Sequence, residues 1–496
     1  MLDQYQVLDS IVLEDLLTQE SSSFYRFLNS VKRDIFHNPK RIVFYNYTPL
    51  PSDLIQHIKD TIVYLDIPDF FILVVDSHQT YQFADYEFKK SDTTEHKPVF
   101  NIANSMCAHA WAGIHVWPDG TCGACCDSTQ KITKPNGEYY NIKENTIEQI
   151  LDSTWMQDLR QQFRENKKAN NCQICWQREE LQLDSKRTLT PHKLENIYGL
   201  INWEQEGQLA FLGGHMGNLC NLKCRICSSA FSSSIANELL SELPRVDRKK
   251  SKHYTISHEA SWASGTTFWD QVKQLAPKIK NFEFLGGEPF LLKQNNDFIE
   301  FLIENDLGHD TIFYFNTNGT QYPKILDHAD QLKKLEITIS IDNIDDRFEL
   351  ERSGAKWADV ENNIRKFVKL GKKIKSLKID IAITVNIQNV FYLPEIIDWA
   401  NLIEVDSYYL NYVTAPTYLA VDSLTAQAKE LVLDKLSNYN FSSDDQEKVR
   451  GIIDKISNIK PGDGKEFCKE MRRFDRLRNQ NFLKTHTDIA KAMGYG

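Results

Sequence analysis

Cysteines dominate the residues that could do chemistry: the chain has ten, and nine of them lie between Cys107 and Cys227. Three form the pattern Cys220-x3-Cys224-x2-Cys227 within the stretch GNLCNLKCRICSSAF. Three thiolates can hold three irons of a four-iron cluster and leave the fourth iron open to another ligand. A structural zinc site would instead require a fourth protein ligand, such as His215. The spacing alone leaves both kinds of site open.

A second group of cysteines precedes the first. Four thiolates from a hairpin and a later CxxC turn could saturate one metal centre: Cys107, Cys125, Cys172 and Cys175. The hairpin is predicted from the Pro-Asp-Gly turn in WPDGTCGACC. Cys122 and Cys126 belong to the same turn, so either could replace Cys125 as a ligand. A structural zinc site with four cysteine ligands remains the alternative to an iron–sulfur cluster.

Alternating strand and helix patterns follow, and these elements must position the first motif. Strands are predicted at residues 209–213, 281–285, 311–316, 336–342, 379–386 and 406–413. Helices are predicted between them, for example at residues 296–304, 322–335 and 358–370. Six such repeats imply a parallel sheet with right-handed crossovers, forming an open α/β barrel. Ligands of these folds gather at the carboxyl ends of the strands, which is where the first cysteine motif is expected.

The CxxxCxxC motif after a first strand resembles that of the radical S-adenosylmethionine (SAM) superfamily. In that family SAM chelates the open iron, an electron from the cluster cleaves the sulfonium, and the 5′-deoxyadenosyl radical abstracts a substrate hydrogen. The resemblance covers roughly residues 205–420 and implies a partial (β/α)6 TIM-like barrel, with Cys220, Cys224 and Cys227 holding the catalytic 4Fe-4S cluster. The residue before the third cysteine is commonly aromatic in the family and is Ile226 here. It packs near the adenine, where a bulky apolar residue should serve.

Two further stretches resemble SAM-binding motifs of the family. FLGGEPFL follows the second predicted strand and is similar to the GGE motif, which recognises the SAM amino group; its residues are Gly286, Gly287, Glu288 and Pro289. An ammonium requires acceptors, and glycines let the backbone approach a ligand closely. SIDNIDDRFELERSG follows the fourth predicted strand, and Ser340 and Arg352 match the positions that bind the SAM carboxylate. A guanidinium suits that role by its fork geometry.

Other positions carry smaller expectations from the same resemblance. Asn343 stands where the family has glycine, and asparagine also accepts a positive φ. The stretch FNTNG, with Asn318, follows the third predicted strand. Thr384 and Asn386 belong to the fifth. Relatives contact the ribose and the adenine at these places, so Asn318, Thr384 and Asn386 are candidate cofactor contacts.

The second cysteine group, with the helical segment between its members, resembles the auxiliary-cluster module called twitch, a shortened SPASM domain. The resemblance implies that Cys107, Cys125, Cys172 and Cys175 hold an auxiliary iron–sulfur cluster, expected to be 4Fe-4S. A cluster ligated only by cysteines suits electron transfer, since no iron is free for coordination. The module follows the radical SAM core in most relatives, whereas here it precedes the core.

The predicted organisation has four parts: an N-terminal α/β domain of unknown role (residues 1–95), the auxiliary module (96–182), the radical SAM core (205–420) and C-terminal helices (421–496). The 496-residue chain has a net charge of −10, so no overall field attracts nucleic acid or anionic lipid. Its N-terminus lacks a basic segment followed by a long apolar stretch, and the apolar run FFILVVDS is too short to span a bilayer. We expect a cytoplasmic protein without membrane or nucleic-acid partners.

The expected activity is reductive cleavage of SAM followed by hydrogen abstraction from a substrate. Peptide and protein modification is the commonest role among twitch and SPASM relatives, so a ribosomally made peptide is the first expectation for the substrate. Oxidation or rearrangement of a small molecule, such as a nucleotide or an aminosugar, is the alternative within the class. A non-catalytic zinc-binding interaction protein is the alternative outside it. The enzyme would also need an electron donor such as flavodoxin or ferredoxin.

Overall fold

The computed structural model describes residues 106–180, 185–188, 201–203 and 205–496, and it also assigns four strands before residue 106. The chain divides into two compact units, of which the first consists of Met1–Cys107, Phe163–Lys168 and Lys186–Leu200. This unit contains a four-stranded sheet in the order β1 (Ile42–Tyr45), β2 (Ile72–Val75), β3 (Thr80–Ala84) and β4 (Glu87–Ser91). β1 and β2 are parallel, and the other pairs are antiparallel. The helices predicted within residues 1–95 lie outside the described residues.

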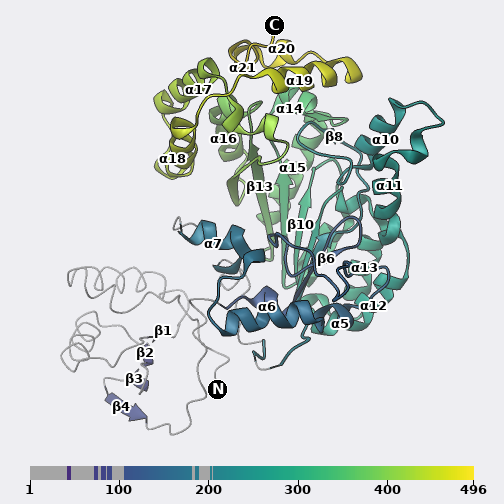
Figure 1. The fold of residues 1–496 in the computed structure, drawn as a ribbon. Helices are drawn as coiled ribbons and strands as arrows, with labels where there is room; N and C mark the ends of the chain where they lie inside the picture. The colour runs from purple at the N-terminus through teal and green to yellow at the C-terminus, as the bar shows by residue number, and fades with distance from the viewer. Residues whose placement is uncertain are drawn as a thin grey trace. The chain divides into compact units, whose positions relative to one another are not determined.

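The second unit is built on an eight-stranded sheet in the order β14-β13-β11-β10-β9-β7-β5-β6 (Figure 1). Its strands are β5 (Gly113–Val116), β6 (Cys122–Gly123), β7 (Phe211–His215), β9 (Asn281–Leu285), β10 (Ile312–Thr317), β11 (Lys334–Ser340), β13 (Leu377–Val385) and β14 (Ser407–Tyr412). The six strands from β7 to β14 in this sheet all run parallel to their neighbours. The predicted six-stranded parallel α/β architecture is therefore confirmed.

Helices connect these strands and cover the sheet (Figure 1). They are α10 (Ser233–Ser241), α11 (Lys252–Glu259), α12 (Thr267–Leu275), α13 (Lys293–Glu304), α14 (Asp345–Glu351), α15 (Trp357–Gly371) and α16 (Leu393–Leu402). α15 buries Val360, Ile364 and Phe367, which recur at helical spacing and form its apolar face. The helix predicted at residues 322–335 is wrong: the segment forms only a 3₁₀ helix, Lys324–Gln331. Pro323 precedes it and β11 already begins at Lys334, so little chain is left for a regular helix.

Two contacts show that the parallel sheet curls into a barrel. Phe282 of β9 stacks on Phe313 of β10, and both rings are buried on the side of α13. Side chains alternate along a strand, so Tyr314 points to the opposite, inner side. There its hydroxyl lies 3.3 Å from the hydroxyl of Tyr409 on β14, although β11 and β13 separate the two strands. Three strand spacings amount to about 14 Å in a flat sheet, so the contact requires strong curvature.

The hairpin β5–β6 extends the barrel sheet at its β7 edge. β5 runs parallel to β7, with Gly113 opposite Phe211 and Val116 opposite Gly214. The strands approach closely at Gly214, where an added Cβ would lie 2.5 Å from the carbonyl oxygen of Val116. The hairpin of the cysteine-rich segment and the barrel therefore share one continuous sheet, which the sequence pattern does not predict.

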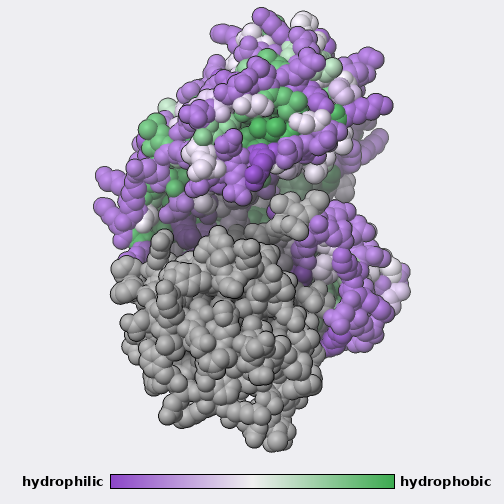
Figure 2. Space-filling model, turned by 90° about the vertical axis from the view of Figure 1, so that its left-hand side faces the viewer, coloured by the Kyte–Doolittle hydropathy of each residue, from purple (hydrophilic) through white to green (hydrophobic). Residues whose placement is uncertain are grey.

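Five helices follow the barrel strands: α17 (Ala426–Asn438), α18 (Ser443–Asn458), α19 (Lys465–Arg478), α20 (Phe482–Thr485) and α21 (Thr487–Ala492). Figure 1 shows them at the end of the sheet where α14 and the two-residue strand β8 (Lys223–Cys224) lie. On the face shown in Figure 2, their surface is mostly hydrophilic, with hydrophobic side chains interspersed. Among the described residues, none of the helices has the length and apolar character to cross a membrane.

Candidate functional site

The first cysteine motif lies in the loop between β7 and α10 (residues 216–232, the cysteine loop), at the carboxyl end of β7. Cys224 belongs to β8, which pairs with β12 (Arg352–Ser353) and places Cys224 opposite Arg352. Burial, helped by the nearby thiolates of Cys227 and Cys220, raises the pKa of Cys224 to about 12, although the guanidinium of Arg352 opposes the shift. The structure therefore brings the three thiols close enough to influence one another's ionisation.

Hydrogen-bond donors surround these sulfurs. The Leu222 backbone N–H donates to Cys220 Sγ at 3.5 Å, and Asn318 Nδ2 lies 3.9 Å from the same sulfur. Arg352 Nη1 lies 3.8 Å from Cys224 Sγ. Donors of this kind stabilise thiolates and tune the potential of a cluster that the thiolates hold.

In the part of the chain that the structure describes, no three Cys, His, Asp or Glu side chains are grouped as ligands of a single metal ion. In a four-iron cluster, each thiolate binds a different iron. His215, the possible fourth ligand of a zinc site, is half-buried at the end of β7. Its ring lies 3.2 Å from His115 Nε2 and stacks on Trp117. Burial lowers the pKa of His215 to about 4, so the ring is neutral.

The Gly-Gly-Glu turn packs directly against the cysteine loop. Gly286 and Gly287 both have positive φ, +70° and +56°. An added Cβ on Gly287 would lie 2.4 Å from the carbonyl oxygen of Leu219, and the Glu288 N–H donates to that oxygen at 2.7 Å. Glycine is therefore required for this close approach. Pro289 follows as the first residue of a short 3₁₀ helix, Pro289–Leu291.

Glu288 is buried, and its carboxylate is held by three donors. Oε1 accepts from Thr317 Oγ1 at 2.7 Å and from the Phe290 N–H at 3.3 Å, while Oε2 accepts from the Asn318 N–H at 2.7 Å. Burial outweighs these bonds and raises the pKa of Glu288 to about 6. Asn318 also donates to Asn221 Oδ1 at 3.0 Å, so it connects the end of β10 with the cysteine loop.

Arg352 pairs with Asp342, which the sequence motif contains but which we did not predict as a site residue. Arg352 Nη2 lies 2.6 Å from Asp342 Oδ2, and both side chains are buried. Burial raises the pKa of Asp342, although the facing guanidinium opposes the shift. Among the residues that the structure describes, the buried Nε atom of Arg352 has no hydrogen-bond partner. Ser340, at the end of β11, donates to Asn316 Oδ1 at 2.8 Å.

The remaining predicted contacts lie beside Asp342 and serve the local fold. The Thr384 N–H donates to Asp342 Oδ1 at 3.1 Å. Asn386 is fully buried, and its side-chain amide donates to the carbonyl oxygen of Thr384. Asn343 does not adopt the positive φ that we expected; that conformation occurs at Asp345 instead. The Asn343 side chain donates to the buried carboxylate of Glu351 at 2.7 Å.

Two segments of the second cysteine group are joined by hydrogen bonds. The Thr129 N–H donates to the carbonyl oxygen of Asn171 at 2.9 Å, which brings the turn after Cys125 next to the segment that contains Cys172. Cys175 lies one turn further on, in α7 (Gln173–Glu180). Cys107 belongs to the other compact unit and is buried. Cys122 is fully buried in β6, where its Sγ lies 3.6 Å from the carbonyl oxygen of Gly120.

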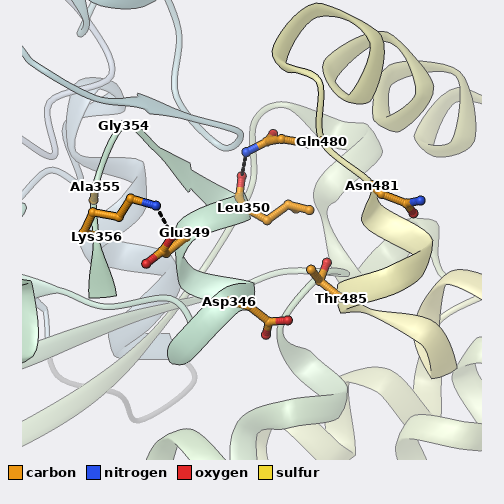
Figure 3. Close-up of a pocket in the computed structure, with 9 residues that line it drawn as sticks. All are labelled: Asp346, Glu349, Leu350, Gly354, Ala355, Lys356, Gln480, Asn481 and Thr485. Atoms are coloured by element: carbon orange, nitrogen blue, oxygen red, sulfur yellow. Dashed lines mark hydrogen bonds and ion pairs between the residues drawn. The ribbon is translucent and has the colours of Figure 1, made fainter. Parts of the chain in front are cut away.

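A separate cleft of about 360 Å³ lies between α14 and α20 (Figure 3). Glu349 and Lys356 form an ion pair at 2.8 Å on one side, and Gln480, Asn481 and Thr485 line the other. None of the site residues predicted from the sequence lines it.

Two segments of the chain match models of known protein families. Residues 215–400 match the model of the radical SAM superfamily, and residues 107–176 match that of SPASM, an iron–sulfur cluster-binding domain. No curated protein matches the chain.

Solved structures that match the chain include native anSMEcpe with bound AdoMet and Cp18Cys peptide (16% identity, TM-score 0.29) and Streptococcus suis SuiB bound to precursor peptide SuiA (14% identity, TM-score 0.29). The matches cover 46% and 62% of this chain, and 58% and 66% of those chains. This chain thus spans less than two thirds of the length of each. The two domain matches imply SAM, a 4Fe-4S cluster and auxiliary iron–sulfur binding. The protein carries a radical SAM domain, and a SPASM domain precedes it in the sequence.

Proposed function

We propose that this protein is a radical SAM enzyme that cleaves SAM reductively and modifies a peptide or protein. The observation that carries the proposal is the matched radical SAM domain, whose three grouped thiols lie at the carboxyl end of β7 beside a buried arginine. When bound, a reduced 4Fe-4S cluster would supply the electron that breaks the sulfonium bond of SAM and so starts hydrogen abstraction. Side chains of this chain would hold the cluster and bind SAM.

The residues present fit this cofactor pair. Cys220, Cys224 and Cys227 would hold the cluster, leaving one iron for SAM. The buried Nε of Arg352, which has no partner among the described residues, is a donor that suits a carboxylate, and Ser340 would add a hydroxyl. Glu288, with Gly286 and Gly287 beside it, would receive the SAM ammonium.

The SPASM domain supports both the auxiliary cluster and the peptide substrate. The matched residues 107–176 include all four predicted ligands: Cys107, Cys125, Cys172 and Cys175. A cluster saturated by cysteines would pass electrons rather than bind substrate. Peptide modification is the commonest role of proteins with this domain, which is why a ribosomally made peptide is proposed over a small molecule. A flavodoxin or ferredoxin would supply the electrons.

Metal analysis and SAM cleavage test the proposal together. Anaerobically purified protein should contain about eight irons per chain, four for each cluster, with matching sulfide. Under dithionite it should convert SAM to 5′-deoxyadenosine. Replacing Cys220, Cys224 and Cys227 with alanine should abolish that conversion, whereas Cys468→Ala, which removes a buried thiol of α19, should leave it intact. Zinc without iron, or SAM cleavage that survives the triple replacement, would contradict the proposal.

A further inference from the structure

Arg225, in the middle of the cysteine motif, reaches out of the cysteine loop to the C-terminal helices. Its side chain is fully buried, and Nη2 lies 2.6 Å from Asp475 Oδ1 of α19 and 3.0 Å from Gln480 Oε1. The guanidinium also faces the rings of Phe474 and Phe482, at 5.5 and 5.8 Å from their centroids. Arg225, one of the two residues between Cys224 and Cys227, is therefore bound to a residue 250 positions later in the chain.

A second arginine makes the reverse connection. Arg478, the last residue of α19, donates through Nη1 to the carbonyl oxygen of Lys223 at 2.7 Å. Its Nη2 lies 2.9 Å from the carboxylate of Glu238 on α10, which also pairs with Lys223 Nζ at 2.9 Å. Both neighbours of Cys224 are thus bound to α19. Arg225 is bound through its own side chain, and Lys223 through its carbonyl oxygen, which accepts from Arg478.

The acceptors of this contact are themselves fixed. Asp475 Oδ2 accepts from the Phe482 N–H and from the Tyr495 hydroxyl, both at 2.7 Å, so the carboxylate is held from both ends. Gln480 donates to Ser353 Oγ at 2.9 Å and more weakly to the Leu350 carbonyl oxygen, the bond drawn in Figure 3. Because Ser353 belongs to β12, the same segment also holds the strand that carries Arg352.

We propose that α19 and the residues up to Tyr495 form a clasp that fixes the cysteine loop against β12, with Arg225, Asp475 and Arg478 as positioning residues. The clasp rests on the proposed function, because the loop it fixes would hold the catalytic cluster. Between β8 and α10 the cysteine loop is irregular chain, and β8 itself pairs with β12, a strand of only two residues. Without the clasp, the local structure that orients Cys224 and Arg352 would open readily.

Hydrogen exchange of the full-length protein without its clusters tests the clasp directly. Asp475→Asn keeps the shape of the side chain but leaves the charge of Arg225 buried without its counter-ion. We expect amides of residues 217–231 to exchange about tenfold faster or more, while those of β9, β10 and β11 keep their parent rates. Glu466→Gln is the matched control, because it removes an exposed ion pair with Lys469 from the same helix, and it should change neither set.

Two further measurements separate positioning from general stability. In reconstituted protein, Asp475→Asn and Arg478→Gln should alter the EPR spectrum of the reduced cluster and speed iron loss to a chelator about tenfold, at a temperature where the fold is intact. If Asp475→Asn does not fold, Gln480→Ala replaces it, since it leaves no new charge unpaired. Parent-level exchange of residues 217–231 in the clasp variants overturns the proposal, as does an equal acceleration in β9–β11. Failure of the proposed function would instead appear as a parent protein without iron.

Discussion

Among single residues, the buried carboxylate of Glu288 should give SAM binding a pH dependence. Burial raises the pKa of Glu288 to about 6, so the carboxylate gains a proton as the pH falls through that value. If the ionised form receives the SAM ammonium, affinity should be full above about pH 7 and fall about tenfold per pH unit below 6. Equilibrium binding of SAM from about pH 5 to 8 measures this effect. Glu288→Gln should bind weakly at every pH, and a variant that kept the parent profile would assign the titration to another group.

A second prediction for a single residue concerns Arg352, because a lysine cannot reproduce the planar, forked set of donors of a guanidinium. The guanidinium already bonds Asp342 through Nη2 and approaches Cys224 through Nη1, which leaves Nε for a ligand. Arg352→Lys keeps the charge but loses that geometry, and we expect SAM to bind about 10- to 100-fold more weakly with full iron content. Anaerobic calorimetry gives the affinity. Arg365→Lys, at an exposed ion pair on α15, is the control and should bind SAM like the parent.

For individual residues, the sequence predicts which side chains lie near one another only where they are close in the chain, and their roles as ligands stay predictions. Cys220, Cys224 and Cys227 are close in the chain, so their grouping follows from the motif, and glycines before Glu288 indicate a tight turn. Asp342 also lies inside a quoted motif, and its position two residues after Ser340 could have identified it. Arg225 could not be recognised in this way. Its partner Asp475 lies 250 residues away, and no local pattern encodes that contact.

Among the elements, the pairing of β5 with β7 depends on the missing side chain of Gly214. A Cβ there would lie 2.5 Å from Val116 O and 2.8 Å from Val116 N, and backbone atoms cannot give way cheaply. Gly214→Ala should therefore lower the free energy of unfolding by about 1–3 kcal/mol, measured by denaturant titration. Gly451→Ala is the matched control: it lies in the exposed middle of α18 with open space around it, and it should be neutral or stabilising. Equal effects of the two substitutions would exclude close strand contact as the cause.

The same pairing shows why elements were easier to predict than their arrangement. The six barrel strands are short apolar segments between helical patterns, so each could be recognised locally and the parallel order followed from the repeats. β5 pairs with β7 across about a hundred intervening residues, and two adjacent glycines in FLGG indicate close approach without naming the partner. The 3₁₀ segment before β11 was mistaken for a helix because apolar spacing does not show how much chain the connection has available.

In the whole molecule, the cysteine-rich segment that precedes the barrel in the sequence adds strands to the barrel sheet. The β5–β6 hairpin pairs through β5 with β7, the first strand of the barrel. The C-terminal helices, which follow the last barrel strand β14 in the sequence, contact the cysteine loop through α19. Chain segments on both sides of the radical SAM domain therefore contribute to the surroundings of its cysteine loop, which the reversed domain order alone does not reveal.

Two cluster sites in one chain should lose their iron independently. Replacing Cys172 and Cys175 with alanine should lower the iron content from about eight to about four per chain, and the remaining cluster should still change its EPR spectrum when SAM is added. Replacing Cys220, Cys224 and Cys227 should also leave about four irons, but without a response to SAM. Cys468→Ala is the control, because that buried thiol of α19 lies outside both cysteine groups, and it should retain about eight irons. If removal of either set emptied both sites, the cysteines would form a single interdependent centre, and the assignment of one saturated and one open cluster would have to be abandoned.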